Sequence, residues 1–279
     1  MRALRAAVVG GLALGAAPGP RAPGGHVPRA QDAPLLVFAA ADLREVLPEL
    51  AAAYRRAGGD SVVVTFGATG DLALQIANGA PADLFFAADE AAVARLTAQH
   101  AVVERTRRLY AIGRLALAVS PAAGANQAGA AGAPPRLADL ARASVRTVAV
   151  ADPARAPYGR AAREALERAG LWAQVGPKVV YTPNVAQAYR VVQDGNADAG
   201  FVSRAALSRA APASYALVDT TLYAPIRQAA AVVAASRRQD AASRFLDYTT
   251  GSAGFAVLRR YGFAPPPGGL AAAPAAAPR

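Results

Sequence analysis

Short apolar runs alternate with amphipathic segments along the chain from residue 35 to residue 261. The runs rich in β-branched and aromatic residues predict strands at 35–39, 62–66, 83–87, 102–110, 115–119, 148–150, 178–181, 199–203 and 226–234. The segments with apolar residues three or four apart predict helices at 42–58, 72–78, 89–99, 137–140, 157–169, 184–195, 240–250 and 252–261. Because strands alternate with helices, we expect an α/β fold with largely parallel sheets that are covered on both faces.

The segment 62–90 reads as a strand, a glycine-broken turn, a helix, a second turn and a second strand. Its first turn, 67–71, has the sequence Gly-Ala-Thr-Gly-Asp. This turn supplies the hydroxyl of Thr69 and several free main-chain N–H groups at the start of a helix, where the helix dipole favours negative charge. The segment therefore predicts a place to hold a small anion.

The same arrangement recurs along the chain, with helix starts directly after predicted strands at Ala41-Asp42, Thr69-Gly70, Pro157-Tyr158 and Asn184-Val185. Ser203 adds a hydroxyl at the end of a fifth strand. In sheets of this kind ligands bind beyond the carboxyl ends of the strands, so we expect these positions to lie together.

The first thirty residues differ from the rest. Arg2 and Arg5 precede the small, apolar run 6–17, and a segment rich in glycine and proline follows. This pattern predicts a secretory signal peptide over 1–30, cleaved between Ala17 and Ala33, and hence a periplasmic protein. Residues 121–135 predict a surface loop, and residues 265–279 predict a disordered tail.

Charge and candidate chemistry narrow the function. The chain has no cysteine, and its formal charge is +11; four of its arginines lie in the predicted leader, which leaves +7. The remaining basic residues are scattered rather than clustered, so nucleic-acid binding is not expected. The two histidines, His26 and His100, form no catalytic or metal-ligand pattern, and the anion turn lacks the lysine of a P-loop. We therefore expect a binding protein without cofactor or metal ligands, and not an enzyme.

Several stretches together resemble the periplasmic molybdate-binding proteins of bacterial ABC transporters. They are 37–43 (VFAAADL), 66–72 (FGATGDL), 79–85 (GAPADLF) with Ala88-Asp89, 152–159 (DPARAPYG), Asn184-Val185 and 261–263 (YGF). The resemblance implies a two-lobed periplasmic-binding-protein fold, each lobe a mostly parallel sheet flanked by helices, with a two-stranded hinge. It places lobe I at 34–112 plus 225–264 and lobe II at 113–224. It also implies a monomer that captures molybdate, and tungstate as well, and delivers it to a membrane permease.

The resemblance places the ligand-contacting positions at Asp42, Thr69, Tyr158, Val185 and Ser203. Molybdenum is bound in this family as an oxyanion, with no direct ligand from the protein. A dianion calls for donors, and neutral donors at helix N-termini hold it without ion pairing. Thr69 keeps the hydroxyl of the serine usual in the family, whereas Tyr158 and Val185 would contribute main-chain N–H groups. Ser203 stands where some members have a tyrosine.

Asp42 departs from the family, because many relatives have a serine there and a carboxylate repels a dianion. Either Asp42 caps its own helix in a capping box with Glu45, which the local pattern favours, or it accepts a proton from an anion such as hydrogen phosphate. Phosphate or sulfate binding by the same fold therefore stays open. So do an exported phosphoester hydrolase that uses Asp42 or Asp71, and a sensor domain without transport.

Overall fold

The computed structural model describes residues 33–121 and 134–269. The predicted leader, most of the predicted loop 121–135 and residues 270–279 of the predicted tail lie outside the described residues. In the part that is described, no helix is long and apolar enough to cross a membrane.

The first sheet has five strands in the order β2-β1-β3-β10-β4. Their bounds are β1 Leu35–Ala40, β2 Val62–Gly67, β3 Leu84–Ala87, β4 Arg108–Gly113 and β10 Ile226–Val232. Strand β1 pairs in parallel with β2 and β3, whereas β10 pairs antiparallel with β3 and β4. The parallel pairing predicted from the βαβ pattern thus holds for β1, β2 and β3, and the late strand β10 enters the sheet in the opposite direction.

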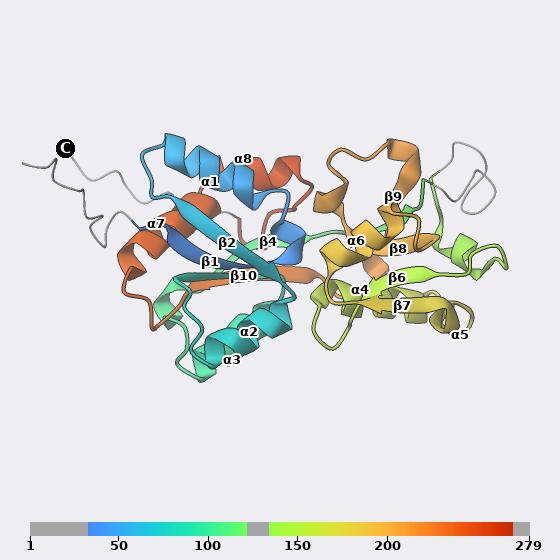
Figure 1. Ribbon diagram of the computed structural model, residues 1–279, viewed down its shortest axis with the longest axis horizontal. Helices are drawn as coiled ribbons and strands as arrows, with labels where there is room; N and C mark the ends of the chain where they lie inside the picture. The colour runs from blue at the N-terminus through green and yellow to red at the C-terminus, as the bar shows by residue number, and fades with distance from the viewer. Residues whose placement is uncertain (1–32, 122–133, 270–279) are drawn as a thin grey trace, which may run out of the picture. The chain divides into compact units, whose positions relative to one another are not determined.

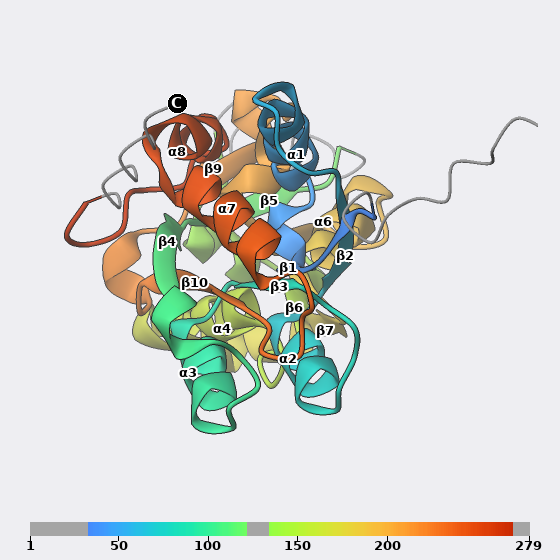
Figure 2. The same ribbon diagram turned by 90° about the vertical axis from the view of Figure 1, so that its left-hand side faces the viewer.

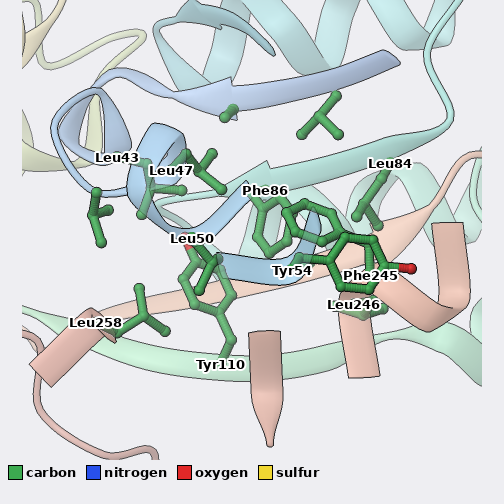
Figure 3. Close-up of a cluster of buried hydrophobic side chains, with 14 of the residues drawn as sticks. Leu43, Leu47, Leu50, Tyr54, Leu84, Phe86, Tyr110, Phe245, Leu246 and Leu258 are labelled. Carbon is green, nitrogen blue, oxygen red and sulfur yellow. The ribbon is translucent and has the colours of Figure 1, made fainter. Parts of the chain in front are cut away.

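Helices cover both faces of this sheet. Helices α1 (Leu47–Arg56), α7 (Gln239–Thr250) and α8 (Ser252–Arg260) lie on one face, and α2 (Thr69–Ala77) and α3 (Glu90–Ala98) lie on the other (Figures 1 and 2). On the first face Phe245 packs against Tyr54 and Phe86, with ring centroids 5.0 and 6.0 Å away (Figure 3). This buried aromatic group fixes α1 and α7 against the sheet.

The second sheet has the order β7-β6-β8-β5-β9. Its strands are β5 Leu115–Val119, β6 Val148–Ala151, β7 Val179–Thr182, β8 Ala199–Ser203 and β9 Tyr215–Leu217. Strand β6 pairs in parallel with β7 and β8, and β5 pairs antiparallel with β8 and β9. Helices α4 (Pro157–Arg168) and α5 (Trp172–Val175) pack in one apolar cluster beside the sheet, and α6 (Val185–Gln193) packs in another. The two sheets with their flanking helices form the two-lobed α/β fold that the resemblance implied.

The chain passes between the sheets at two neighbouring places. Strand β4 ends at Gly113 and β5 begins at Leu115, while β10 begins at Ile226 after the chain leaves the second sheet. Gly113 and Ile226 are paired across β4 and β10, and the main-chain N–H of Leu115 donates to the Tyr223 hydroxyl at 3.2 Å. The two crossing segments are therefore tied to each other.

Two predicted strands are shorter than their apolar patterns suggested. The run 102–110 was expected to be one strand, but a 3-10 turn, Glu104–Thr106, interrupts it and β4 begins only at Arg108. Thr106 explains the break, because its hydroxyl donates to the carbonyl of Val103 and accepts from the main-chain N–H of Val232. Strand β10 ends at Val232 rather than at Ala234.

Candidate functional site

Three helices begin at the carboxyl ends of parallel strands. Helix α2 follows β2 and starts at Thr69, α4 follows β6 and starts at Pro157, and α6 follows β7 and starts at Val185. Among the described residues, no hydrogen bond uses the main-chain N–H of Thr69, Tyr158 or Val185. These are the groups that helix geometry leaves without an acceptor, and each carries the positive end of a helix dipole.

Side chains fix the start of two of these helices. Asn184 accepts from the main-chain N–H groups of Ala186 and Gln187, both at 3.1 Å, so it caps α6, as its spacing predicted. The Thr69 hydroxyl accepts from the main-chain N–H of Ala88 at 3.1 Å, which ties the start of α2 to the end of β3. Because this bond uses an oxygen lone pair, the hydroxyl proton of Thr69 stays available for another acceptor.

A buried polar network lies beside these helix starts. The Tyr158 hydroxyl donates to Oδ2 of Asp42 at 3.1 Å, and Nε2 of Gln228 donates to the same oxygen. Gln228 is held in turn by the Tyr110 hydroxyl, which donates to its Oε1 at 2.6 Å. The network joins Tyr158 of α4 to Asp42, in the 3-10 turn Ala41–Leu43, and to β10 and β4.

The prediction that Asp42 caps its own helix is wrong. The short turn Ala41–Leu43 that follows β1 has no side-chain cap, and α1 begins only at Leu47, beyond the reach of the expected capping box. The carboxylate instead accepts from Tyr158 and Gln228, which are distant in sequence. The carboxylate oxygen was expected to accept from a main-chain N–H group of its own helix. It accepts instead from a tyrosine hydroxyl and a glutamine amide on other elements.

Asp42 is a buried acid without a cationic partner. It is 3% exposed, its Oδ1 has no hydrogen-bond partner, and no ion pair among the described residues includes it. Burial raises the pKa of this carboxyl from 3.8 to about 6, although the hydrogen bonds from Gln228 and Tyr158 lower it. Burial also raises the pKa of Tyr158 well above its ordinary value, and the nearby Asp42 carboxylate contributes to that shift.

Four of the five predicted site residues line one cavity: Asp42, Thr69, Tyr158 and Val185. The other lining residues include Ala41, Ala68, Ala88 and Asn184. The cavity volume is about 10 Å³, which is room for about one water molecule, so a larger anion enters only if the walls move apart. Each of the four residues is at most 4% exposed.

Ser203, the fifth predicted residue, does not line this cavity. It lies fully buried at the end of β8, where its hydroxyl accepts from the main-chain N–H of Ala206 at 3.3 Å. Its observed contact is therefore that of a cap on the turn Arg204–Leu207.

Two contacts next to the cavity join elements of the two sheets. The main-chain N–H of Gly70 donates to the carbonyl of Arg155 at 3.0 Å, and Arg160 of α4 forms an ion pair with Asp89 at the start of α3. A side chain at position 70 would touch the Arg155 main chain, which accounts for a glycine there. The helix starts on one sheet are thus held directly against those on the other.

Sequence reasoning missed Gln228, Tyr110 and Gly113. Gln228 and Tyr110 lie inside strands, where an apolar pattern hides a single polar residue, although a glutamine directly before the apolar run 229–234 is a usable signal. A Cβ atom on Gly113 would collide with the Tyr158 hydroxyl and with Gln228, so this glycine makes room for the network. Local sequence holds no sign of that contact.

Three comparisons with known proteins agree with this geometry. The model of the family described as bacterial extracellular solute-binding protein matches residues 35–264. A molybdate-binding protein of Azotobacter vinelandii is 31% identical over 237 residues, which cover 84% of this chain and 91% of that protein. A molybdate-binding protein of Rhodobacter capsulatus is 30% identical over 257 residues, covering 92% of this chain and 93% of that protein.

A solved structure supports the same assignment. The periplasmic molybdate-binding protein of Azotobacter vinelandii superposes with a TM-score of 0.75 at 29% identity, covering 83% of this chain and 99% of that chain. The family match extends from β1 to the residues that follow α8, and so includes both sheets and every helix start at the cavity. The chain therefore belongs to the bacterial extracellular solute-binding proteins.

Proposed function

We propose that this protein captures molybdate, and tungstate as well, and delivers it to the permease of an ABC transporter. The observation that carries the proposal is the set of three unpartnered main-chain N–H groups, at Thr69, Tyr158 and Val185, around one cavity. The names of the relatives from Azotobacter and Rhodobacter supply the identity of the anion. Binding requires no reaction, and we assign no catalytic residue.

The donors suit a tetrahedral dianion. Thr69 lies at the start of a helix on the first sheet, whereas Tyr158 and Val185 lie in the first turns of helices on the second. An anion between them would gain hydrogen bonds from both lobes only when the lobes are closed, which couples binding to closure. The contacts would be to oxygen atoms of the anion, and no side chain would ligate molybdenum.

The remaining parts of the proposal concern the whole protein. We propose a signal peptide at 1–30, lobe I at 34–112 plus 225–264, lobe II at 113–224, and a monomer in the periplasm. The positions of β4, β5 and β10 support the two crossing points, because the chain changes sheets between Gly113 and Leu115 and again before Ile226.

A calorimetric titration of the anion-free protein tests the proposal. Molybdate and tungstate are expected to bind with one site per chain, and sulfate and phosphate more weakly. The Thr69→Val variant removes one hydroxyl donor at nearly constant volume, so molybdate binding should weaken by roughly 10- to 100-fold, as expected for a hydrogen bond to a charged group. Thr69→Ser, which keeps the hydroxyl, is the matched control. Absence of molybdate binding in the unaltered protein would refute the function.

Phosphate is the second candidate, and Asp42 is the observation that favours it. An ionised carboxylate in the cavity can accept a hydrogen bond from the O–H of hydrogen phosphate, which molybdate lacks near neutral pH. Tight phosphate binding that is lost in Asp42→Ser, together with no response to molybdate, would establish this alternative.

A further inference from the structure

An anion site needs hydrogen-bond donors, and one group at this cavity is not a donor. Asp42 lines the cavity beside three unpartnered N–H groups, yet a carboxylate can only accept hydrogen bonds. We infer that molybdate capture takes up one proton from solvent at Oδ1 of Asp42, so that this atom becomes an O–H donor to the bound anion. The inference rests on the proposed function, and it means that the protein binds a proton together with molybdate.

The geometry selects Oδ1 as the atom that takes the proton. Oδ2 already accepts from Tyr158 and from Gln228, and both of these bonds would be weakened by a proton on that oxygen. Oδ1 is buried and has no partner, so a proton there costs no existing hydrogen bond. An added O–H on Oδ1 therefore completes the network and does not break it.

No cation offsets the charge of Asp42. The titratable or charged groups that face it, share a pocket with it or lie on a turn packed against its own are Tyr158 of α4, Tyr110 of β4, Arg44 and Glu45 after its own turn, Arg190 of α6 and Arg204 of the turn Arg204–Leu207. None of the four charged groups forms an ion pair with it in the described part of the chain. Both tyrosines have their pKa raised well above the ordinary value, so they stay neutral and cannot take the role of Asp42.

Protons can reach the carboxyl from solvent. Asp42 also lines a second pocket, of about 280 Å³, which it shares with Arg44, Gln187 and Arg190. The exposed side chains that border this pocket connect it to the surface. Asp42 thus lies between the anion cavity and a larger pocket that is lined by exposed polar side chains.

A dianion bound in the cavity favours the protonated, neutral form of the Asp42 carboxyl. Burial, opposed in part by hydrogen bonds, already brings the pKa of the carboxyl to about 6, and a like charge in contact raises the pKa further. Above pH ~7 the free protein holds Asp42 ionised while the molybdate complex holds it protonated, so binding takes up about one proton. By linkage the dissociation constant should then rise about tenfold for each pH unit above ~7.

The protonation state also separates two classes of anion. Neutral Asp42 donates and therefore suits a fully deprotonated oxyanion, whereas ionised Asp42 accepts and suits an anion that brings its own O–H. Hydrogen phosphate would then bind without net proton uptake, because its own proton would occupy the hydrogen bond to Asp42. The number of protons taken up thus reports which class of anion the site holds.

The test is calorimetry of the anion-free protein with molybdate at pH ~7.5, in two buffers of different ionisation enthalpy. The difference in apparent binding enthalpy gives the number of protons taken up, which is expected to be about one. Repeating the titration from pH ~7 to ~8.5 should show a loss of affinity of about tenfold per pH unit. Asp42→Asn, which mimics the neutral acid, and Asp42→Ser should both bind molybdate with no proton uptake and with a flat pH profile.

Each outcome has a definite meaning. Molybdate binding by the unaltered protein with no proton uptake would overturn the inference and leave the proposed function intact. Uptake of one proton that persists in Asp42→Asn would also overturn it, because the proton would then reside elsewhere. Absence of molybdate binding by the unaltered protein would overturn the inference and the proposed function together. If Asp42→Asn fails to fold, Asp42→Ser supplies the same comparison, and a proton that persists in that variant would equally overturn the inference.

Discussion

Replacing Asp42 with asparagine should stabilise the ligand-free protein at neutral pH. The buried carboxylate has no cation beside it and leaves Oδ1 without a partner, so its charge is a cost to the folded state. Asparagine keeps the shape and an acceptor oxygen for Tyr158 and Gln228 but carries no charge. An acid that serves anion capture would thereby reduce stability when no anion is bound.

The magnitude follows from the pKa of Asp42, which burial raises from 3.8 to about 6. A shift of roughly two units at ~1.4 kcal/mol per unit corresponds to about 3 kcal/mol. Because the folded-state pKa is the higher one, the folded protein binds the proton more tightly than the unfolded chain does. The destabilisation of the folded state by ionised Asp42 is therefore small below pH ~4, grows as the pH rises through ~6, and is complete above ~7.

Denaturant unfolding of both proteins at pH ~4.5 and ~7.5, without molybdate, measures this effect. The free energy of unfolding of Asp42→Asn should exceed that of the unaltered protein by about 2 kcal/mol more at pH ~7.5 than at pH ~4.5. The difference is not the full ~3 kcal/mol, because about one third of the destabilisation by the ionised carboxylate is already present at the lower pH. Because the two proteins are compared at the same pH, the contributions of all other titrating groups to the unfolding free energy cancel. An equal difference in unfolding free energy at both pH values, or an asparagine variant that is less stable at pH ~7.5, would show that the buried charge of Asp42 does not destabilise the fold.

Three further substitutions test other parts of the structure. Gly113→Ala places a methyl group against the Tyr158 hydroxyl, so it should destabilise by about 1–3 kcal/mol in thermal or denaturant unfolding, and adding Tyr158→Phe should restore part of the loss. Asp89→Asn removes the ion pair with the largely exposed Arg160, worth at most about 1 kcal/mol, so stopped-flow measurements should find molybdate release accelerated no more than about fivefold. Phe245→Ala empties a fully buried position of the first sheet's core and should cost about 3–5 kcal/mol in denaturant unfolding, with an unchanged dissociation constant for molybdate as evidence that the cavity is unaffected.

The sequence was most informative where local rules act alone. The alternation of strands and helices predicted an α/β fold with helices on both faces of its sheets, and the spacing at Asn184 predicted a cap that the structure contains. The positions of Tyr158 and Val185 directly after β6 and β7 were enough to predict that these two lie together, because neighbouring parallel strands of one sheet end at a common edge. Thr69 follows a strand of the other sheet, so its place beside them was implied by the resemblance to a two-lobed fold. Their role as anion ligands stays a prediction.

The failures came where partners are distant in sequence. The spacing from Asp42 to Glu45 suggested a capping box, but Tyr158 and Gln228, 116 and 186 residues away, supply the hydrogen bonds instead. Ser203 follows a strand like the other site residues, yet its hydroxyl caps a turn and lies outside the cavity. A one-dimensional pattern states which residues end strands, but it does not state which of them face one another.

A crystal structure of the protein grown with molybdate, with anomalous scattering recorded at the molybdenum edge, locates the anion directly. One strong peak is expected at the cavity bounded by Asp42, Thr69, Tyr158 and Val185, with anion oxygens within hydrogen-bond distance of the main-chain N–H groups of the last three. A peak at any other place on the protein, or none at a molybdate concentration that saturates the calorimetric titration, would show that these N–H groups do not form the anion site.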